Sequence, residues 1–435
     1  MTETAVGVLG LGSLFTLLAI RMPVALSMLL VGLVGTIVIN GMIPGLSSMS
    51  GEAMQVATEY NLIVIPLFIL MGNLAGISGM STDLFAAAYS WMGHRKGGLA
   101  SATVAACAGF AALSGSSLAS AVTMGRVALP EMKRFNYANS LSTGAVAAGG
   151  TLGFLIPPSG GMIIYAILTE QSIGRLFMAG ILPGIILTLL FIGAIWYTTF
   201  RNPEAGPAGP RASRQERVQS LVRALPILGV VTVTIGGMYS GVFTPVEAAG
   251  VGAFLMMLMS AWRRALSLKN LEKVILDTLK TTSTVFLILI GAFVFIPFMA
   301  LTEVPSNLVT FLTALPIGEY GILLLIVLTY MLLGTFLEGI AMLVLTLPVV
   351  MPLVANMGWD PIWFGIIIVI VLEMGMISPP VGINVFIVKG IAPDVPMGQI
   401  FRGIWPFWFA MALMILLLVL VPEIATYIPD TMMGT

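Results

Sequence analysis

Long apolar stretches recur along the whole chain and are separated by short polar segments. Each stretch is about 17 to 25 residues long, which is the length an α-helix needs to cross a bilayer core of roughly 30 Å. The chain shows no alternating ten-residue pattern of the kind that a transmembrane β-barrel requires. The pattern therefore predicts an all-α polytopic membrane protein with the lipid bilayer as its solvent.

The composition agrees with this class. Of the 435 residues, 58% are hydrophobic and only 9% are charged, whereas about 25% of the residues in a soluble domain are charged. The net charge is zero, so nothing indicates a nucleic-acid partner. The single cysteine, Cys107, lies among small residues and is best explained by packing. Arg21, the first basic residue, follows the first apolar stretch, which argues against a cleaved signal peptide and favours an outward-facing N-terminus.

Two of the apolar stretches contain a double proline. The first reads GFLIPPSG at 153–160, and the second reads GMISPPVG at 375–382. Because proline lacks a backbone donor and clashes with the preceding turn, both stretches should be broken helices. Proline kinks in membrane helices often only shape packing, and that explanation remains open for either copy alone. Two copies in matching contexts favour a binding role, since broken helices expose carbonyls where lipid is excluded.

The two double prolines are 222 residues apart, and the same offset pairs other positions. Pro23 matches Pro245 and Pro130 matches Pro352, and Gly180 matches Gly403 after one inserted residue. We therefore expect two repeats, at residues 1–200 and 224–435. They are joined by a linker at 201–223 that contains five arginines and should be cytoplasmic.

Basic residues distinguish an inverted repeat from a parallel one, because short cytoplasmic loops collect Lys and Arg. The segment 263–280 carries five basic residues, whereas its counterpart at 41–58 carries none. The HRK sequence at 94–96 likewise has a counterpart at 303–319 without basic residues. Matching loops should thus lie on opposite sides of the membrane. This predicts an inverted repeat with both termini outside, the architecture of many secondary transporters.

A hydroxyl-rich segment, SGSS at 114–117, lies between two apolar runs that are too short to form two full spans. We expect a re-entrant hairpin that enters near Gly97 and leaves near Lys133, with a counterpart tip at 334–339. Helix packing is the alternative role for such glycines and serines. Acidic residues in apolar surroundings usually mark sites, and the best examples are Glu338 and Glu373. Glu247 is a third, with a helix cap as its alternative role.

Hydroxyl and carbonyl oxygens are hard ligands suited to Na⁺, so each hairpin tip and broken helix should hold one ion, making at least two. The expected first site comprises Gly115, Ser116, Ser117, Gly153, Pro157 and Ser159. The expected second site comprises Thr335, Glu338, Gly339, Gly375, Ser378 and Gly382. The expected substrate contacts are Ser114, Pro158, Pro380 and Asn384.

Enzymatic activity is not expected from this sequence. A membrane serine hydrolase needs a His or Lys base near its serine, but the only histidine, His94, lies in a predicted cytoplasmic loop. A channel is harder to exclude by composition. Two broken helices and two hairpins in inverted halves favour a carrier that occludes its substrate.

At these motifs the chain resembles the large membrane subunit of the tripartite ATP-independent periplasmic (TRAP) transporters. The resemblance covers nearly the whole chain and rests on IPLFILMGNLAGISGMSTDLF at 65–85, SGSSLA at 114–119, PEMKRFNY at 130–137, GFLIPPS at 153–159, GVFTPVEAA at 241–249, LEGIAM at 337–342 and EMGMISPPVGINVFIVKGIAP at 373–393.

The resemblance implies more than the spacing does. It implies Na⁺-coupled import of a small organic acid, delivered by a periplasmic binding protein, together with a small four-helix membrane subunit. It also implies the fold of the elevator-type ion transporter superfamily and a bacterial inner-membrane location. Residues 80–180 and 303–400 would move as a transport part against the remaining helices as a scaffold. The runner-up is a Na⁺/dicarboxylate carrier of the same superfamily that needs no binding protein.

Overall fold

The computed structural model describes residues 2–432, and within that range the chain forms helices and no strands. Eight helical segments in these residues are long and apolar enough to cross a membrane. The chain is therefore a multi-pass, all-α membrane protein, as the apolar pattern predicts. Apolar helices of up to 17 residues, such as α6 (Gly98–Ser114), add to this set.

The helices of the two halves follow one another in the same order. The first half contains α1 (Glu3–Ala19), α2 (Val24–Asn40), α3 (Met42–Thr58), η1 (Tyr60–Ile63), α4 (Val64–Ile77), α5 (Met80–Met92), α6, α7 (Ser117–Arg134), α8 (Asn139–Leu155), α9 (Gly160–Leu168) and α10 (Ile173–Arg201). After η2 (Pro203–Ala205), the second half contains α11 (Arg214–Tyr239), α12 (Pro245–Trp262), α13 (Leu268–Leu301), α14 (Val304–Thr313), α15 (Gly318–Gly334), α16 (Gly339–Met357), α17 (Pro361–Met376), α18 (Ile383–Ile391), α19 (Met397–Leu420) and α20 (Glu423–Met432).

Helix starts recur at the offset seen in the sequence. Helix α7 begins at Ser117 and α16 at Gly339, while α8 begins at Asn139 and α17 at Pro361. The two halves differ in the segment that precedes each hairpin. In the second half this segment is α13, one continuous helix of 34 residues, whereas the first half divides the equivalent length into α3, η1 and α4.

Both double prolines interrupt their helices, as predicted. The first break separates α8 from α9, and the second separates α17 from α18. At the first break the Ser159 hydroxyl donates to the Phe154 carbonyl and accepts from the Met162 amide. One side chain thereby satisfies a carbonyl at the end of α8 and caps the start of α9.

Each break is accompanied by a helical hairpin. Helices α6 and α7 are joined by Gly115, at φ +58°, and Ser116, whose hydroxyl accepts from the Ala119 amide. The positive φ at Gly115 suits glycine, because a Cβ there would be strained. Helices α15 and α16 form the second hairpin, with its tip at residues 335–338.

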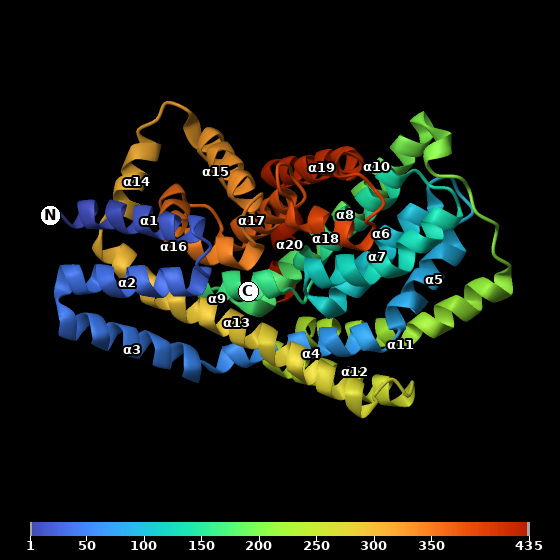
Figure 1. Ribbon diagram of the computed structural model, residues 1–435, viewed down its shortest axis with the longest axis horizontal. Helices are drawn as coiled ribbons and strands as arrows, with labels where there is room; N and C mark the ends of the chain where they lie inside the picture. Colours follow the sequence, from blue (N-terminus) through green and yellow to red (C-terminus); the bar gives the residue numbers. More distant parts are fainter. Residues whose placement is uncertain (1, 433–435) are drawn as a thin grey trace.

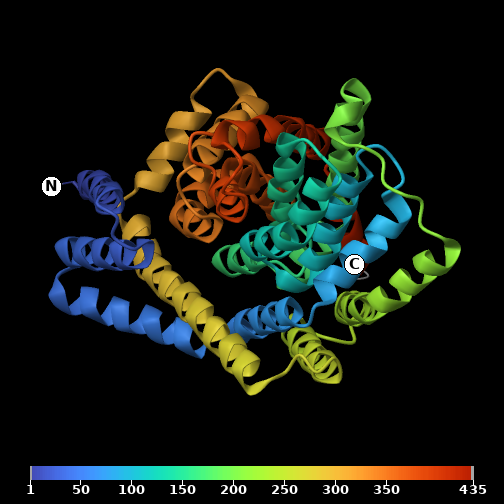
Figure 2. The ribbon, with the colours of Figure 1, turned by 45° about the vertical axis from the view of Figure 1, so that its right-hand side comes forward.

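The hairpins and broken helices form a central bundle, and other helices lie around it. In Figures 1 and 2, helices α2, α3, α13, α4, α12 and α11 follow one side of this bundle. Helix α13 packs on α2, and α12 packs on α4. Gly32 allows the first of these contacts, since a Cβ there would lie 2.7 Å from the Val294 carbonyl oxygen.

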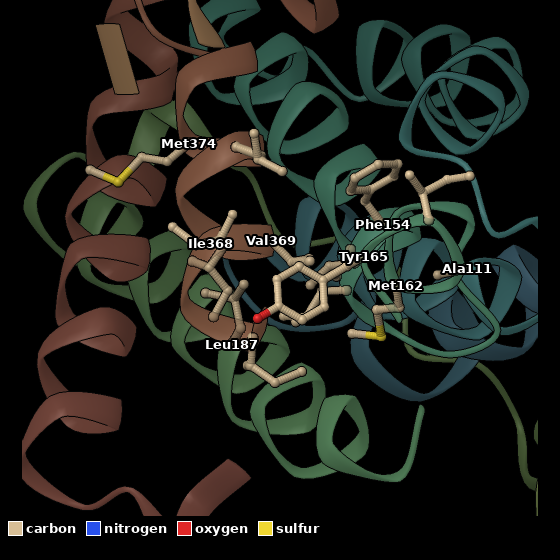
Figure 3. Close-up of a cluster of buried hydrophobic side chains, with 14 of the residues drawn as sticks. Ala111, Phe154, Met162, Tyr165, Leu187, Ile368, Val369 and Met374 are labelled. Carbon is tan, nitrogen blue, oxygen red and sulfur yellow. The ribbon is translucent and has the colours of Figure 1, made fainter. Parts of the chain in front are cut away.

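The two broken helices meet in the core of the bundle. Tyr165 of α9 points toward Ile368 and Val369 of α17 (Figure 3). Its hydroxyl donates to the Pro361 carbonyl at 2.6 Å, and its ring occupies space that Gly365 leaves free. Because Tyr165 is completely buried, this contact holds the first half against the second.

Candidate functional site

The tip of the first hairpin lies directly on the first break. The Gly160 amide donates to the Gly115 carbonyl at 3.0 Å. A Cβ on Gly153 would lie 2.5 Å from the Ser116 carbonyl oxygen, and a Cβ on Gly115 would lie 2.8 Å from the Pro158 carbonyl oxygen. Glycine at these positions therefore lets two backbones approach closely enough to combine their carbonyl groups.

The second hairpin meets the second break in a related way. The Gly382 amide donates to the Thr335 carbonyl at 3.4 Å. A Cβ on Gly375 would lie 2.8 Å from the Gly334 Cα. The structure thus places each hairpin tip in contact with the broken helix of the same half.

Helix ends concentrate at both contacts. Four helices begin there, with Ser116, Ser159, Glu338 and Gly382 as their N-cap residues. Four others end there, with Gly115, Ile156, Thr335 and Ile377 as their C-cap residues. The beginnings of helices favour anions, and the ends of helices, with their free carbonyls, favour cations. The arrangement can therefore bind a carboxylate and cations close to one another.

Most of the predicted hydroxyl ligands also take part in local hydrogen bonds. Ser114 pairs with Ser120 at 2.8 Å, and Thr335 donates to the Leu332 carbonyl. Ser378 donates to the Met374 carbonyl and accepts from the Trp408 indole of α19 at 3.0 Å. Thr335 and Ser378 donate their protons to carbonyls, so each keeps a lone pair that can face a cation. The free backbone carbonyls at the helix ends can add to such coordination.

Two of the three acidic candidates act as helix caps. The Glu338 carboxylate accepts from the Ala341 amide at 3.4 Å at the start of α16. Glu247 forms a capping box with Thr244 at the start of α12, which is the alternative role expected for it. Glu338 remains at the second hairpin tip, whereas Glu247 lies outside both contacts.

The third acidic candidate, Glu373, was assigned to neither predicted site. It is 1% exposed, and the side chains of Ser117 and Asn384 neighbour its carboxyl group. Ser117 comes from the first hairpin, whereas Glu373 and Asn384 flank the second break. The structure therefore joins residues of both halves, a relationship that the local spacing of either half does not contain.

Phe154 is a contact residue that sequence reasoning missed. A Cβ on Gly161 would lie 2.1 Å from its ring, and a Cβ on Gly339 would lie 3.2 Å from it. The ring therefore touches the first break and the second hairpin. Figure 3 shows it beside the core formed by α9 and α17. No signal in the sequence separates this aromatic residue from the other apolar residues around it.

The two breaks differ in exposure. Pro157 and Pro158 are buried, whereas Pro379 and Pro380 are exposed. Phe336, at the second hairpin tip, is 59% exposed. The second break and its hairpin tip are therefore more exposed than the first break.

Comparisons with known proteins agree with this architecture. Residues 11–424 match the family model described as the tripartite ATP-independent periplasmic transporter, DctM component. The fold is similar to that of the Alcanivorax borkumensis YdaH transporter, with a TM-score of 0.64 at 15% identity over 90% of both chains. At that identity the likeness concerns the fold alone.

Several curated relatives are transporter permeases rather than enzymes. The chain is 36% identical to the C4-dicarboxylate TRAP transporter large permease protein DctM of Pseudomonas aeruginosa, over 88% of this chain and 89% of that protein. It is 30% identical to the sialic acid permease SiaM of Vibrio cholerae, over 97% and 99% of the two chains. It is 30% identical to the ectoine permease TeaC of Halomonas elongata, over 99% and 98%. The chain therefore belongs to the DctM family, the large permease proteins of the tripartite ATP-independent periplasmic transporters.

Proposed function

We propose that this permease imports a small organic acid and couples that import to entry of Na⁺. The observation that carries the proposal is the contact of each hairpin tip with a broken helix, exemplified by the Gly160–Gly115 hydrogen bond. Such contacts place helix ends and freed carbonyls inside a membrane protein, where secondary transporters bind substrate and coupling ions. At least two Na⁺ would move with each substrate.

The first ion would be held by Gly115, Ser116 and Ser117 on the hairpin and by Gly153, Pro157 and Ser159 at the break. The second would be held by Thr335, Glu338, Gly339, Gly375, Ser378 and Gly382. Na⁺ exchanges its water shell for several oxygen dipoles at once. The carbonyl ends of α6, α8, α15 and α17 face the two contacts and supply such dipoles.

The acid would bind between the two ion sites. Ser114, Pro158, Pro380 and Asn384 are the contacts we propose, since they adjoin the starts of helices that favour a carboxylate. Relatives are named for C4-dicarboxylates, sialic acid and ectoine. Each of these carries a carboxylate, and another relative is named for isethionate, a sulfonate. A small organic acid, most commonly a carboxylate, is therefore the substrate class we propose for this chain.

The permease would work in the bacterial inner membrane with both termini in the periplasm. A periplasmic binding protein would deliver the acid, and a small four-helix membrane subunit would complete the complex. Residues 80–180 and 303–400 would move as an elevator against the scaffold formed by the rest of the chain. The contact of α9 with α17 supports this division, because it unites parts of both halves into one bundle.

Reconstitution in proteoliposomes tests the proposal. Proteoliposomes that contain the complex receive the binding protein and a radiolabelled acid on the outside. They should accumulate the acid only when the Na⁺ concentration is higher outside than inside. Flux should rise with more than the first power of Na⁺ concentration. Uptake that persists without the binding protein would instead favour a self-sufficient Na⁺/dicarboxylate carrier. Uptake that needs no Na⁺ gradient would favour a channel.

A further inference from the structure

A cavity of about 360 Å³ lies between α7, α8 and the loop after α18, and its lining includes none of the residues of the two proposed ion sites. Helices α7, α8 and α18 pack against one another in the central bundle (Figure 1). The polar side chains that line the cavity come from one face of α7, from the start of α8 and from the loop, and include Arg126, Lys133, Asn139, Ser142 and Asp394. The cavity is therefore polar, although apolar helices surround it.

The cavity lies toward one end of the hairpin and of the second broken helix. Helix α7 ends at Arg134, α8 begins at Asn139, and Lys389 lies in the last turn of α18. Basic residues collect on the cytoplasmic side of a membrane protein, so in the proposed topology these helix ends face the cytoplasm. The hairpin tip, which adjoins the proposed substrate contacts, lies at the opposite end of α7.

An accessible stripe along α7 connects the cavity with the hairpin tip. Ala119, Arg126 and Lys133 are exposed and Thr123 is half-buried, and their spacing of three, four or seven residues places them on one face of the helix. With a rise of 1.5 Å per residue, Arg126 lies about 13 Å from Ser117 and about 10 Å from Lys133 along the helix. Arg126 is thus roughly midway between the tip and the cytoplasmic end.

Arg126 gives the cavity a net positive charge. Its charged lining residues are Arg126, Lys133 and Asp394. The charges of Lys133 and Asp394 balance in an ion pair, whereas Arg126 forms no ion pair among residues 2–432. A charged side chain within a membrane protein is costly and usually faces a water-filled cavity on a substrate path. A guanidinium group there attracts anions and matches a carboxylate with two parallel hydrogen bonds.

We propose that Arg126 forms a release subsite, in which its guanidinium group binds the carboxylate of the acid after the acid has left the hairpin tips. The inference rests on the proposed function and extends it, because the contacts proposed at the tips, Ser114, Pro158, Pro380 and Asn384, include no positive charge. A cation midway along the path stabilises an anion where the dielectric constant is low. The exposure of Arg126 keeps this binding weak, so the acid can leave for the cytoplasm.

Thiol modification of a cysteine in the cavity tests the charge of this site without measuring transport. The reporter is Leu129→Cys, which lines the cavity one turn from Arg126, in a permease without Cys107. In phosphatidylcholine proteoliposomes that contain the complex, this cysteine should react faster with methanethiosulfonate ethylsulfonate, an anion, than with the cationic ethyltrimethylammonium reagent, each rate divided by that of free cysteine. Arg126→Gln should lower this anion preference at least about tenfold, because local fields raise encounter rates by that order.

Matched variants keep the result interpretable. Arg214→Gln removes an arginine at the start of α11, outside the cavity, and should leave the anion preference unchanged. Arg126→Lys retains the charge and should restore most of the preference that Arg126→Gln loses. Asn139→Cys, an exposed position of the same cavity, replaces the reporter if Leu129→Cys does not fold.

Succinate tests the recognition of a carboxylate. It should slow the reaction of Leu129→Cys with methyl methanethiosulfonate, a neutral reagent, and this protection should be lost in Arg126→Gln. Dimethyl succinate, which has no charge, should protect neither protein. Because the reagent is neutral, protection by succinate reports occupancy of the cavity rather than a change in its electric field.

Three results would overturn the release subsite. They are an anion preference that persists in Arg126→Gln, equal protection by succinate and by dimethyl succinate, and an anion preference that disappears when phosphatidylglycerol is added to the membrane. In the last case a lipid headgroup would occupy Arg126. Each of these results leaves Na⁺-dependent uptake by the wild type untouched, and only the absence of that uptake would overturn the proposed function.

Discussion

Gly153 and Ser116 lie so close that a Cβ on Gly153 would be 2.5 Å from the Ser116 carbonyl oxygen. The obstructing atom belongs to the backbone, so a side chain at residue 153 cannot be accommodated by a rotamer change. One side of the contact is the first hairpin tip, and the other is the end of α8. The distance between tip and break therefore depends on glycine at this position.

Gly153→Ala should weaken Na⁺ binding strongly for this reason. The added methyl group must push the hairpin from the break, at an overpacking cost of about 1–3 kcal/mol, and apparent Na⁺ affinity should fall at least about tenfold. Ser116→Ala should cost less, since it removes one cap and one hydroxyl while every carbonyl remains. Na⁺ titration of substrate uptake measures both effects.

Gly193→Ala is the matched control, because a Cβ on Gly193 of α10 meets no atom within 4 Å. Alanine favours a helix over glycine by about 1 kcal/mol, so this variant should be neutral or slightly stabilised. A Gly153→Ala protein with normal Na⁺ affinity would show that the tip and the break do not form an ion site.

Glu338→Gln should weaken apparent Na⁺ affinity several-fold while uptake remains coupled to Na⁺. The side chain caps α16 at the second hairpin tip, and the amide keeps its size while losing its negative charge. Caps of this kind contribute about 0.5–2 kcal/mol. Uptake of the labelled acid at varied Na⁺ provides the measurement. An unchanged Na⁺ dependence in a folded protein would leave Glu338 with a purely structural role.

Cysteine pairs should distinguish moving from fixed contacts. Ser90 of α5 and Ser220 of α11 have hydroxyl oxygens 2.7 Å apart, and they lie on opposite sides of the proposed division into transport part and scaffold. In a protein without Cys107, the pair at 90 and 220 should crosslink in one transport state only. Adding Na⁺ and substrate should therefore change its yield.

A pair within the proposed transport part provides the control for that experiment. Lys133 and Asp394 form an ion pair at 2.6 Å, and cysteines at these two positions should crosslink equally in every condition. If pairs across the proposed division are as insensitive to Na⁺ and substrate as this pair, the elevator proposal fails.

The ion pair between Lys133 and Asp394 should make a small pH-dependent contribution to stability. The hydrogen bond from Lys133, at 2.6 Å, is the main cause that holds the pKa of Asp394 below its usual range. A depressed carboxyl pKa stabilises the folded state above the unfolded value of about 3.9, and the effect is lost as pH falls through the folded value.

Lys133→Met should therefore unfold at a slightly lower temperature than the wild type at pH 7, and the difference should shrink as the pH falls below the unfolded value of about 3.9. Because both side chains are exposed, high salt should abolish the difference as well. Thermal unfolding of the detergent-solubilised protein measures this. Lys96→Met, in the loop after α5, should show no comparable pH dependence, and an equal response of both variants would argue against the pair.

The sequence by itself determined the membrane class, the two helix breaks and the hairpin between Gly97 and Lys133. Each of these features depends on a few neighbouring residues. A double proline ends a helix wherever it occurs, and Gly115 followed by Ser116 favours a turn and a cap. Their recurrence 222 residues later also predicted which tip lies on which break.

Only the tertiary structure decided which apolar surfaces are buried. Residues 362–376 of α17 are all buried, while Leu324, Leu328 and Leu332 of α15 are exposed. The two helices are similarly apolar. Because lipid and the protein interior both accept apolar side chains, the sequence pattern cannot tell a buried helix from one that faces lipid. Glu373, Asn384 and Ser117 meet for the same reason. Packing between the halves joins these residues, and no local spacing records it.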